Sequence, residues 1–311
     1  MAPETYRQQQ KKMKKLQNDG NFHQTLAPIL FLLPNLIIFS VFIIYPAFMG
    51  LRLSFMNSGI FTGNQFVGLA NFRTLFQDEV YWITFRNTLV YSVFTVILMM
   101  IVSLALAMLL SKGAVKFESG FRALFYIPAL ISMIAVGISW RFILGDEMGI
   151  FNYILSIFNK GPVGWLTNQT LAMANVIMVS VWAQSGYYMV MYIAGLQAIP
   201  VELYEAAEID GANRWAKFKR ITIPMLRSTI LVVLVLATIQ SFKAYELIVT
   251  MTKGGPGYAT KFVVQQVYEV AFLEDRLGYA SAMSIVLMFV IGLFTIIQFK
   301  LTRNGEGAVN E

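Results

Sequence analysis

Residues 201–225, VELYEAAEIDGANRWAKFKRITIPM, are a polar stretch between two long apolar ones, and this arrangement decides the fold. The run before it, 161–201, carries no charged residue, and a second apolar run begins at Ser228. A bilayer core of roughly 30 Å is crossed by about 20 helical residues, so each flank can cross the membrane once. The polar stretch is therefore expected to be a loop at one membrane face.

The composition of the whole chain agrees with this interpretation. Of 311 residues, 57% are hydrophobic and only 13% are charged, which describes a membrane protein rather than a soluble domain. Backbone groups must be satisfied within each crossing, so we expect an all-α integral membrane protein. Six transmembrane helices are expected at about 29–51, 87–110, 122–144, 171–196, 227–251 and 278–300. They make up a transmembrane domain over 26–300, with a basic tail over 1–25, a loop over 200–226 and a second tail over 301–311.

The distribution of Lys and Arg predicts the orientation, because short loops rich in these residues stay in the cytoplasm. With the N-terminus inside, the cytoplasmic side collects most of them: Arg7, Lys11, Lys12, Lys14, Lys15, Lys112, Lys116, Arg122, Arg214, Lys217, Lys219, Arg220, Arg227, Lys300 and Arg303. The other side has fewer, over longer loops. Both termini and the loop over 200–226 are therefore expected in the cytoplasm. This bias explains the net charge of +7 and gives no reason to expect a nucleic-acid partner.

Several other classes of protein are disfavoured. The apolar run over 26–51 is longer than the core of a signal peptide and ends without a small-residue cleavage site, so we expect it to be retained as the first helix. The chain has no cysteine, which excludes disulfides and thiolate chemistry. Its single histidine, His23, is expected at the level of the lipid headgroups rather than as a proton carrier. We expect no catalytic residue and no metal site.

The polar loop has the features of two short helices. Pro200 is suited to begin a helix, and the acids on its first turns are favoured by the helix dipole. Asp210 and Gly211 form a turn signal that ends this helix. A second helix is expected over Ala212–Arg220. Together the two helices would make a compact projection bent at Gly211.

The spacing within this loop resembles a known family. Glu205, Ala206, Ala207 and Gly211 are followed after nine residues by Ile221, Thr222, Ile223 and Pro224. This is similar to the E-A-A-x3-G-x9-I-x-L-P loop in the membrane subunits of binding-protein-dependent ABC importers, with Ile in place of Leu, an apolar exchange of similar volume. The resemblance implies a type I importer transmembrane fold and a projection that docks in a groove of an ATPase. The implied coupling residues are Glu205, Ala206, Ala207, Asp210, Gly211 and Pro224.

The motor itself is not encoded here, because the sequence lacks the G-x-x-x-x-G-K-[ST] loop that holds phosphates. No cofactor is expected in this chain, and ATP and Mg would be bound by a partner ATPase. The resemblance implies a heterodimer with a second homologous permease, two ATP-binding subunits, an extracytoplasmic solute-binding protein and surrounding membrane lipid. It also implies a multi-pass protein of a bacterial or archaeal cytoplasmic membrane.

Polar side chains near the bilayer midplane are costly and usually face the bundle interior or a water-filled cavity. Gln184 and Gln240 lie at the centres of the fourth and fifth expected helices. Amide and hydroxyl groups interleaved with aromatic rings suit an uncharged, polyhydroxylated solute. Ordinary hydrogen bonding between helices explains the same residues equally well. The candidate solute-binding residues are Ser180, Gln184, Tyr187, Tyr188, Gln240, Ser241, Ala244 and Tyr245.

Residues 182–256 also resemble the larger permease subunit of the maltose importer, and 252–260 resemble other sugar permeases of that kind. The sugar-contacting positions implied by the resemblance are Ser180, Ala183, Gln184, Tyr187, Ala237, Gln240, Ser241 and Ala244. In the fourth helix only Tyr187 keeps the maltose-type residue, so the chain departs from a maltose site. Lys243 and Glu246, three residues apart, are expected to form a structural ion pair rather than to contact solute.

These observations favour a permease subunit that carries a sugar or oligosaccharide in an ATP-driven importer. A permease for a polyol or glycerol phosphate is an alternative within the same family. A different class, an integral-membrane enzyme acting on a lipid-linked sugar, would need a carboxylate pair or metal cluster near one interface, and the paired acids occur in loops instead. An ion-driven transporter would need intramembrane acids, of which only Glu246 is available.

Overall fold

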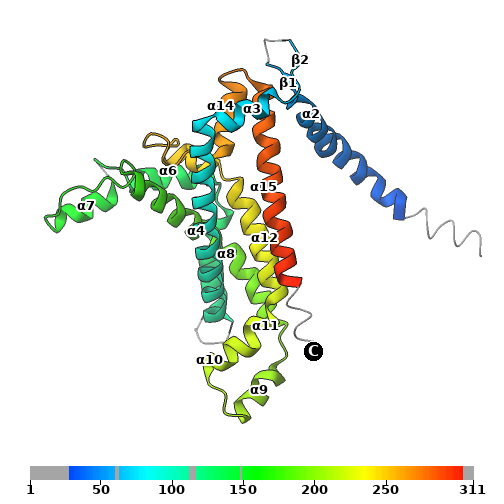
Figure 1. Ribbon diagram of the computed structural model, residues 1–311. Coiled ribbons are helices and arrows are strands. Elements are labelled where there is room, and N and C mark those ends of the chain that lie inside the picture. Colours follow the sequence, from blue (N-terminus) through cyan, green and yellow to red (C-terminus); the bar gives the residue numbers. More distant parts are fainter. Residues whose placement is uncertain (1–27, 60–62, 112–116, 148, 304–311) are drawn as a thin grey trace, which may run out of the picture.

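A computed structural model describes residues 28–59, 63–111, 117–147 and 149–303 (Figure 1). The predicted basic tail over 1–25, His23, Lys112 and Lys116 lie outside the described residues, as does most of the predicted tail over 301–311. The described residues are helical apart from their loops and one short hairpin of β1 (Met56–Asn57) and β2 (Gln65–Phe66).

Four continuous helices are long and apolar enough to cross a membrane. They are Pro28–Leu53, which includes the π-helical segment η1 (Ser40–Ile44) and α2 (Tyr45–Leu53), then α4 (Glu79–Leu110), α8 (Gln169–Gln197) and α15 (Leu277–Arg303). Two bent pairs of helices also pass this test, Glu118–Leu130 with Met133–Ile143 and Arg214–Met225 with Arg227–Phe242, which raises the number of candidate spans to six. The all-α membrane architecture is therefore as predicted.

Two of the predicted spans are interrupted. The range 122–144 contains α5 (Glu118–Leu130) and α6 (Met133–Ile143), which are bent by 96°. Pro128, inside α5, weakens the helix just before this break. The range 227–251 contains α12 (Arg227–Phe242) and α13 (Glu246–Met251), separated at residues 243–245. Both breaks allow the backbone to turn beside the same interior cavity.

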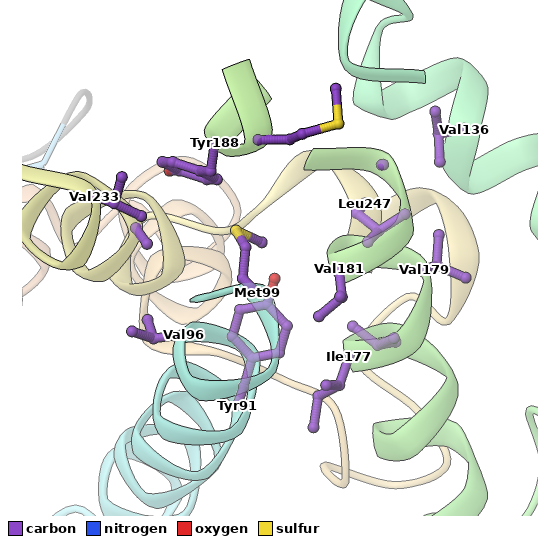
Figure 2. Close-up of a cluster of buried hydrophobic side chains, with 14 of the residues drawn as sticks. Tyr91, Val96, Met99, Val136, Ile177, Val179, Val181, Tyr188, Val233 and Leu247 are labelled. Atoms are coloured by element: carbon purple, nitrogen blue, oxygen red, sulfur yellow. The ribbon is translucent and has the colours of Figure 1, made fainter. Parts of the chain in front are cut away.

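The bundle is built around α4, which packs along α8 and α12, while α15 packs against α12 and against α14 (Val263–Phe272). Its main apolar core gathers side chains from α4, α6, α8, α12 and α13, among them Tyr91, Met99, Tyr188, Val233 and Leu247 (Figure 2). Close approach of α8 to α5 depends on Gly186, where an added Cβ would overlap the carbonyl of Phe125. The first helix contacts α15 through α2 and otherwise extends away from the bundle, and its most apolar segment is not buried (Figure 1).

The two ends of the bundle differ in what they carry (Figure 1). The lower end in Figure 1 carries α9 (Val201–Ile209), α10 (Arg214–Lys217), the π-helical segment η2 (Phe218–Thr222) and α11 (Ile223–Met225). The upper end carries the hairpin, α3 (Ala70–Gln77) and α14, and α7 (Ile150–Ile157) projects to one side. A tight turn at residues 254–256 follows α13, with Gly254 at φ +86°.

Candidate solute cavity and coupling loop

A cavity of about 440 Å³ opens in the interior of the bundle, where α4, α8, α12 and α13 meet the break between α5 and α6. Its lining mixes aromatic, amide, aliphatic and charged side chains. The lining residues are Tyr91, Ala129, Ile131, Met133, Ser180, Gln184, Tyr187, Tyr188, Leu236, Gln240, Lys243, Ala244, Tyr245, Glu246 and Leu247. Such a mixed lining suits a small polar solute that also has apolar faces.

The structure brings together all but one of the eight candidate solute-binding residues. The exception is Ser241, which does not line the cavity. It is buried on the packed side of α12 and donates a hydrogen bond to the carbonyl of Thr238 at 2.8 Å. Ala183 and Ala237, which the maltose resemblance implied, are also buried in the core and away from the lining. Ser241, Ala183 and Ala237 therefore face the packed side of their helices in this structure.

The two midplane glutamines have side chains open to the cavity. Gln184 is half-buried and Gln240 is exposed, and neither makes a side-chain hydrogen bond to another described residue. Hydrogen bonding between helices of this chain was the alternative explanation for them, and no such bond is found within the described part of the chain. A polar side chain without a hydrogen-bond partner inside an apolar helix bundle costs free energy unless water or solute supplies the partner.

The hydroxyl of Ser180 forms two hydrogen bonds within this chain. Its hydroxyl donates to the carbonyl of Val176 at 2.8 Å and accepts from the hydroxyl of Tyr91 at 2.8 Å. Tyr91 was not predicted, although a tyrosine followed by Ser92 and Thr95 in an apolar helix is a signal that could have indicated it. Its ring packs against Phe262 with centroids 4.6 Å apart, so this part of the wall is fixed.

Two neighbouring tyrosines of α8 differ in their exposure, and the buried one supports the exposed one. Tyr188 is 1% exposed, whereas Tyr187 is 46% exposed. Their rings meet edge to face with centroids 5.1 Å apart, which is a favourable aromatic geometry. Tyr187 is therefore held by Tyr188 and offers its free face to the cavity.

The expected ion pair between Lys243 and Glu246 is wrong. That expectation assumed an uninterrupted helix, in which residues three apart face each other. In the structure α12 ends at Phe242 and α13 begins at Glu246, so the two residues do not lie on one continuous helix. Both are exposed, both line the cavity, and neither takes part in an ion pair within the described residues. The cavity wall therefore carries two separate charges, whereas the sequence had predicted that they would pair with each other.

The polar loop forms the two-helix projection that was predicted, with different bounds for the second helix. α9 follows Pro200, and Gly211 at φ +73° makes the bend. The second helix begins at Arg214 rather than Ala212, because the side chain of Asn213 accepts a hydrogen bond from the amide of Ala216 at 2.8 Å. It also continues past Arg220 through η2 and α11.

Two side-chain contacts join the two helices of this loop. The hydroxyls of Tyr204 and Thr222 lie 2.9 Å apart, and Lys217 forms an ion pair with Glu208 at 3.0 Å. The loop therefore can move as one unit. Of the predicted coupling residues, Glu205, Ala206, Asp210, Gly211 and Pro224 are exposed and Ala207 is half-buried.

The same loop presents apolar side chains to the outside. Ile209 is 88% exposed and Trp215 is 68% exposed. Apolar side chains gathered on a polar projection mark a surface for another protein. Among the residues that the structure describes, no group of His, Asp or Glu could hold a metal ion.

Residues 82–304 match the family described as "Binding-protein-dependent transport system inner membrane component". The arabinooligosaccharides transport system permease AraP of Bacillus subtilis is 35% identical over 289 residues, covering 92% of this chain and 91% of that protein. The sn-glycerol-3-phosphate transport system permease UgpA of Agrobacterium fabrum is 34% identical, with coverage of 91% and 96%.

One solved structure with the same fold comes from a bacterial ABC transporter involved in the import of the acidic polysaccharide alginate. A chain of that transporter superposes with a TM-score of 0.81 at 25% identity, covering 93% of this chain and 99% of that one. The fold is therefore that of an ABC importer transmembrane subunit.

Proposed function

The chain belongs to the family of binding-protein-dependent transport system inner membrane components, and we propose that it carries an oligosaccharide or a related polyhydroxylated solute through the membrane in an ATP-driven importer. A solute-binding protein outside the cell delivers the solute. ATP is hydrolysed by two separate subunits, and a second homologous permease completes the cavity. This chain provides one wall of the pathway and one docking loop.

One observation carries the choice of solute class. Gln184 and Gln240 line the cavity, and their side-chain amides form no hydrogen bond with other residues that the structure describes. Tyr187 offers a ring face beside them. Amides pair with hydroxyl groups, and an aromatic face packs against the C–H face of a sugar ring. Relatives named for arabinooligosaccharides, trehalose or maltose, and lactose support the same class.

Glycerol phosphate is the second candidate solute. The relative named for sn-glycerol-3-phosphate is as similar to the chain as the sugar permeases are. Lys243, exposed in the cavity, provides a cation that a phosphate can pair with. Glu246 in the same wall opposes a dianion, so the saccharide remains the favoured solute.

The loop around Gly211 is the proposed link to the motor. We infer that it faces the cytoplasm, together with both termini, because most Lys and Arg residues lie on that side. ATP binding favours the closed form of the ATPase pair, and a loop joined by two side-chain contacts follows that closure as a unit. Because the ATPase subunits bind one conformation of the two permeases more tightly than the other, their closure shifts the cavity between inward-facing and outward-facing conformations.

Uptake by the whole complex in proteoliposomes tests this proposal. The panel contains arabino-oligosaccharides, malto-oligosaccharides, trehalose, lactose and glycerol 3-phosphate, each with the cognate binding protein. We expect ATP-dependent uptake of at least one saccharide and no ATP hydrolysis by the purified chain alone. Uptake of glycerol 3-phosphate only would favour the second candidate, and transport without the ATPase would contradict the proposal.

A matched pair of variants tests the cavity itself. Gln184→Leu removes an amide that faces the cavity, whereas Ser241→Ala removes a hydroxyl that lies outside it. Loss of one hydrogen bond to solute costs about 1 kcal/mol, so uptake by Gln184→Leu should fall about fivefold. Ser241→Ala should transport at nearly the wild-type rate. Equal uptake by wild type and Gln184→Leu would assign the glutamine to packing.

A further inference from the structure

Three aromatic rings form a continuous row that starts in the cavity and leaves it along the upper end of the bundle. Tyr245 lines the cavity at the break between α12 and α13. Its ring lies 5.6 Å from that of Tyr268 in α14, and Tyr268 lies 5.1 Å from Phe272, one turn further along α14. The planes of both pairs are tilted by 44°. We call these three residues the aromatic row.

The outer two rings of the row are open rather than packed into the core. Tyr268 is 45% exposed and Phe272 is 59% exposed. The opposite face of α14 carries Val263, Val270 and Ala271, which are buried in the second apolar core together with α15. The buried face therefore packs α14 against the bundle, and the aromatic row is not part of that packing. The row is left free on the side where α14 meets the cavity rim.

Polar groups accompany the row along its length. Lys243 and Glu246 are exposed on the cavity wall next to Tyr245 in sequence. Glu269, adjacent to Tyr268, is held by Lys261 at 2.5 Å and by the amide of Gln265 at 2.9 Å. Aromatic faces bordered by charged and hydrogen-bonding groups are suited to sugar rings, which have apolar C–H faces and polar edges.

We propose that the aromatic row is a stacking subsite for the sugar units of an oligosaccharide that extend beyond the cavity. The inference rests on the proposed saccharide transport and adds a binding site outside the interior cavity. The row begins at Tyr245 in the cavity wall and continues along α14, so a saccharide held in the cavity can extend its further units along these rings. Tyr245 accepts the unit at the rim, and Tyr268 and Phe272 accept the following units.

The experiment uses the assembled complex in proteoliposomes, saturating binding protein, and malto- and arabino-oligosaccharides of two and four units. The test variant is the double substitution Tyr268→Leu with Phe272→Leu, which keeps apolar bulk and removes both rings. The matched control is Tyr268→Phe with Phe272→Tyr, which keeps both rings. Maximal uptake rate and ATP hydrolysis are measured for each.

We expect the leucine variant to carry the four-unit saccharide about tenfold more slowly than wild type, from the loss of two aromatic contacts. Uptake of the two-unit saccharide should stay within about twofold, and the ring-keeping control should match wild type for both lengths. This dependence on length would not arise if the rings only contacted lipid or a neighbouring subunit.

Two results would overturn the inference alone while leaving saccharide transport intact. One is equal uptake of both lengths by wild type and the leucine variant, as expected for rings that face lipid. The other is an equal loss for both lengths, or a complex that fails to assemble, as expected for rings that pack against another subunit. Failure of the wild-type complex to carry any saccharide would instead refute the proposed function and the aromatic row together.

Discussion

The upper and lower ends of the bundle are stabilised in different ways. At the upper end, buried side chains connect distant parts of the chain: Tyr279 in α15 donates a hydrogen bond to Asp78 at 2.6 Å, and the amide of Val263 donates to Thr88 at 3.0 Å. At the lower end, neither α9 nor α10 has a buried residue. The long-range hydrogen bonds of the upper end are made within this chain, whereas the lower end leaves its surface for a partner.

This difference separates stability from coupling. Substitutions in these upper-end hydrogen bonds should reduce the free energy of unfolding and affect transport only through the amount of folded protein. Substitutions at the lower end should leave the chain folded and disconnect it from the ATPase. The following predictions test that separation.

The largest effect is expected for Gly211→Pro. Gly211 has φ +73°, and proline holds φ near −65°, so the bend between α9 and α10 must change. Uptake should fall at least about tenfold, since the loop no longer fits its docking groove. Gly211→Asn is the matched control, because asparagine tolerates positive φ, and it should keep about half of the uptake or more. Wild-type uptake by Gly211→Pro would remove the coupling role.

An intermediate effect, on stability, is expected for Asp78→Ala. One carboxylate oxygen of Asp78 caps α4 by accepting from the amides of Val80 and Tyr81, and the other accepts from Tyr279. Loss of the cap and of the tyrosine contact should lower the free energy of unfolding by about 2 kcal/mol. Denaturant unfolding in detergent measures this change.

The single contact can be separated from the cap with Tyr279→Phe, which should cost about 1 kcal/mol. Uptake per folded complex should be unchanged in both variants. A large loss of uptake at normal stability would give the contact between Asp78 and Tyr279 a direct role in transport and break the comparison.

The smallest effect is expected for Glu208→Gln at the lower end. Its ion pair with Lys217 is largely exposed on the glutamate side, where the side chain is 76% exposed, so it should contribute less than about 1 kcal/mol. The hydroxyl contact between Tyr204 and Thr222 remains to join the two helices. Uptake should stay within about twofold of wild type. A loss as large as that of Gly211→Pro would show that this ion pair holds the loop together.

Much of the architecture could be predicted because it depends on local signals. Apolar runs of membrane-spanning length indicated the long helices, and the helix after Pro200 and the bend at Gly211 follow from the residues at those positions. Gln184 and Gln240, which stand out in the sequence as polar residues within apolar helices, line the cavity.

The remaining features depend on tertiary structure. The break at residues 243–245 contains neither glycine nor proline, so no local sequence signal predicts it. The ion pair between Lys243 and Glu246 was predicted for a continuous helix and is absent for that reason. Ser241 follows Gln240 but faces the core, because helical spacing alone does not say where a cavity ends. The aromatic row joins Tyr245 to Tyr268 across a turn whose path the sequence does not give.

The central claim is that the loop at the lower end binds an ATPase inside the cell. Labelling of a single cysteine tests this claim most directly. The chain has no native cysteine, and Ala206 is exposed on α9, so Ala206→Cys supplies one unique thiol there. A membrane-impermeant maleimide should react only from the cytoplasmic side, and added ATPase subunits should protect the thiol. Reaction from the outer side, or an unchanged rate with the ATPase bound, would contradict the account.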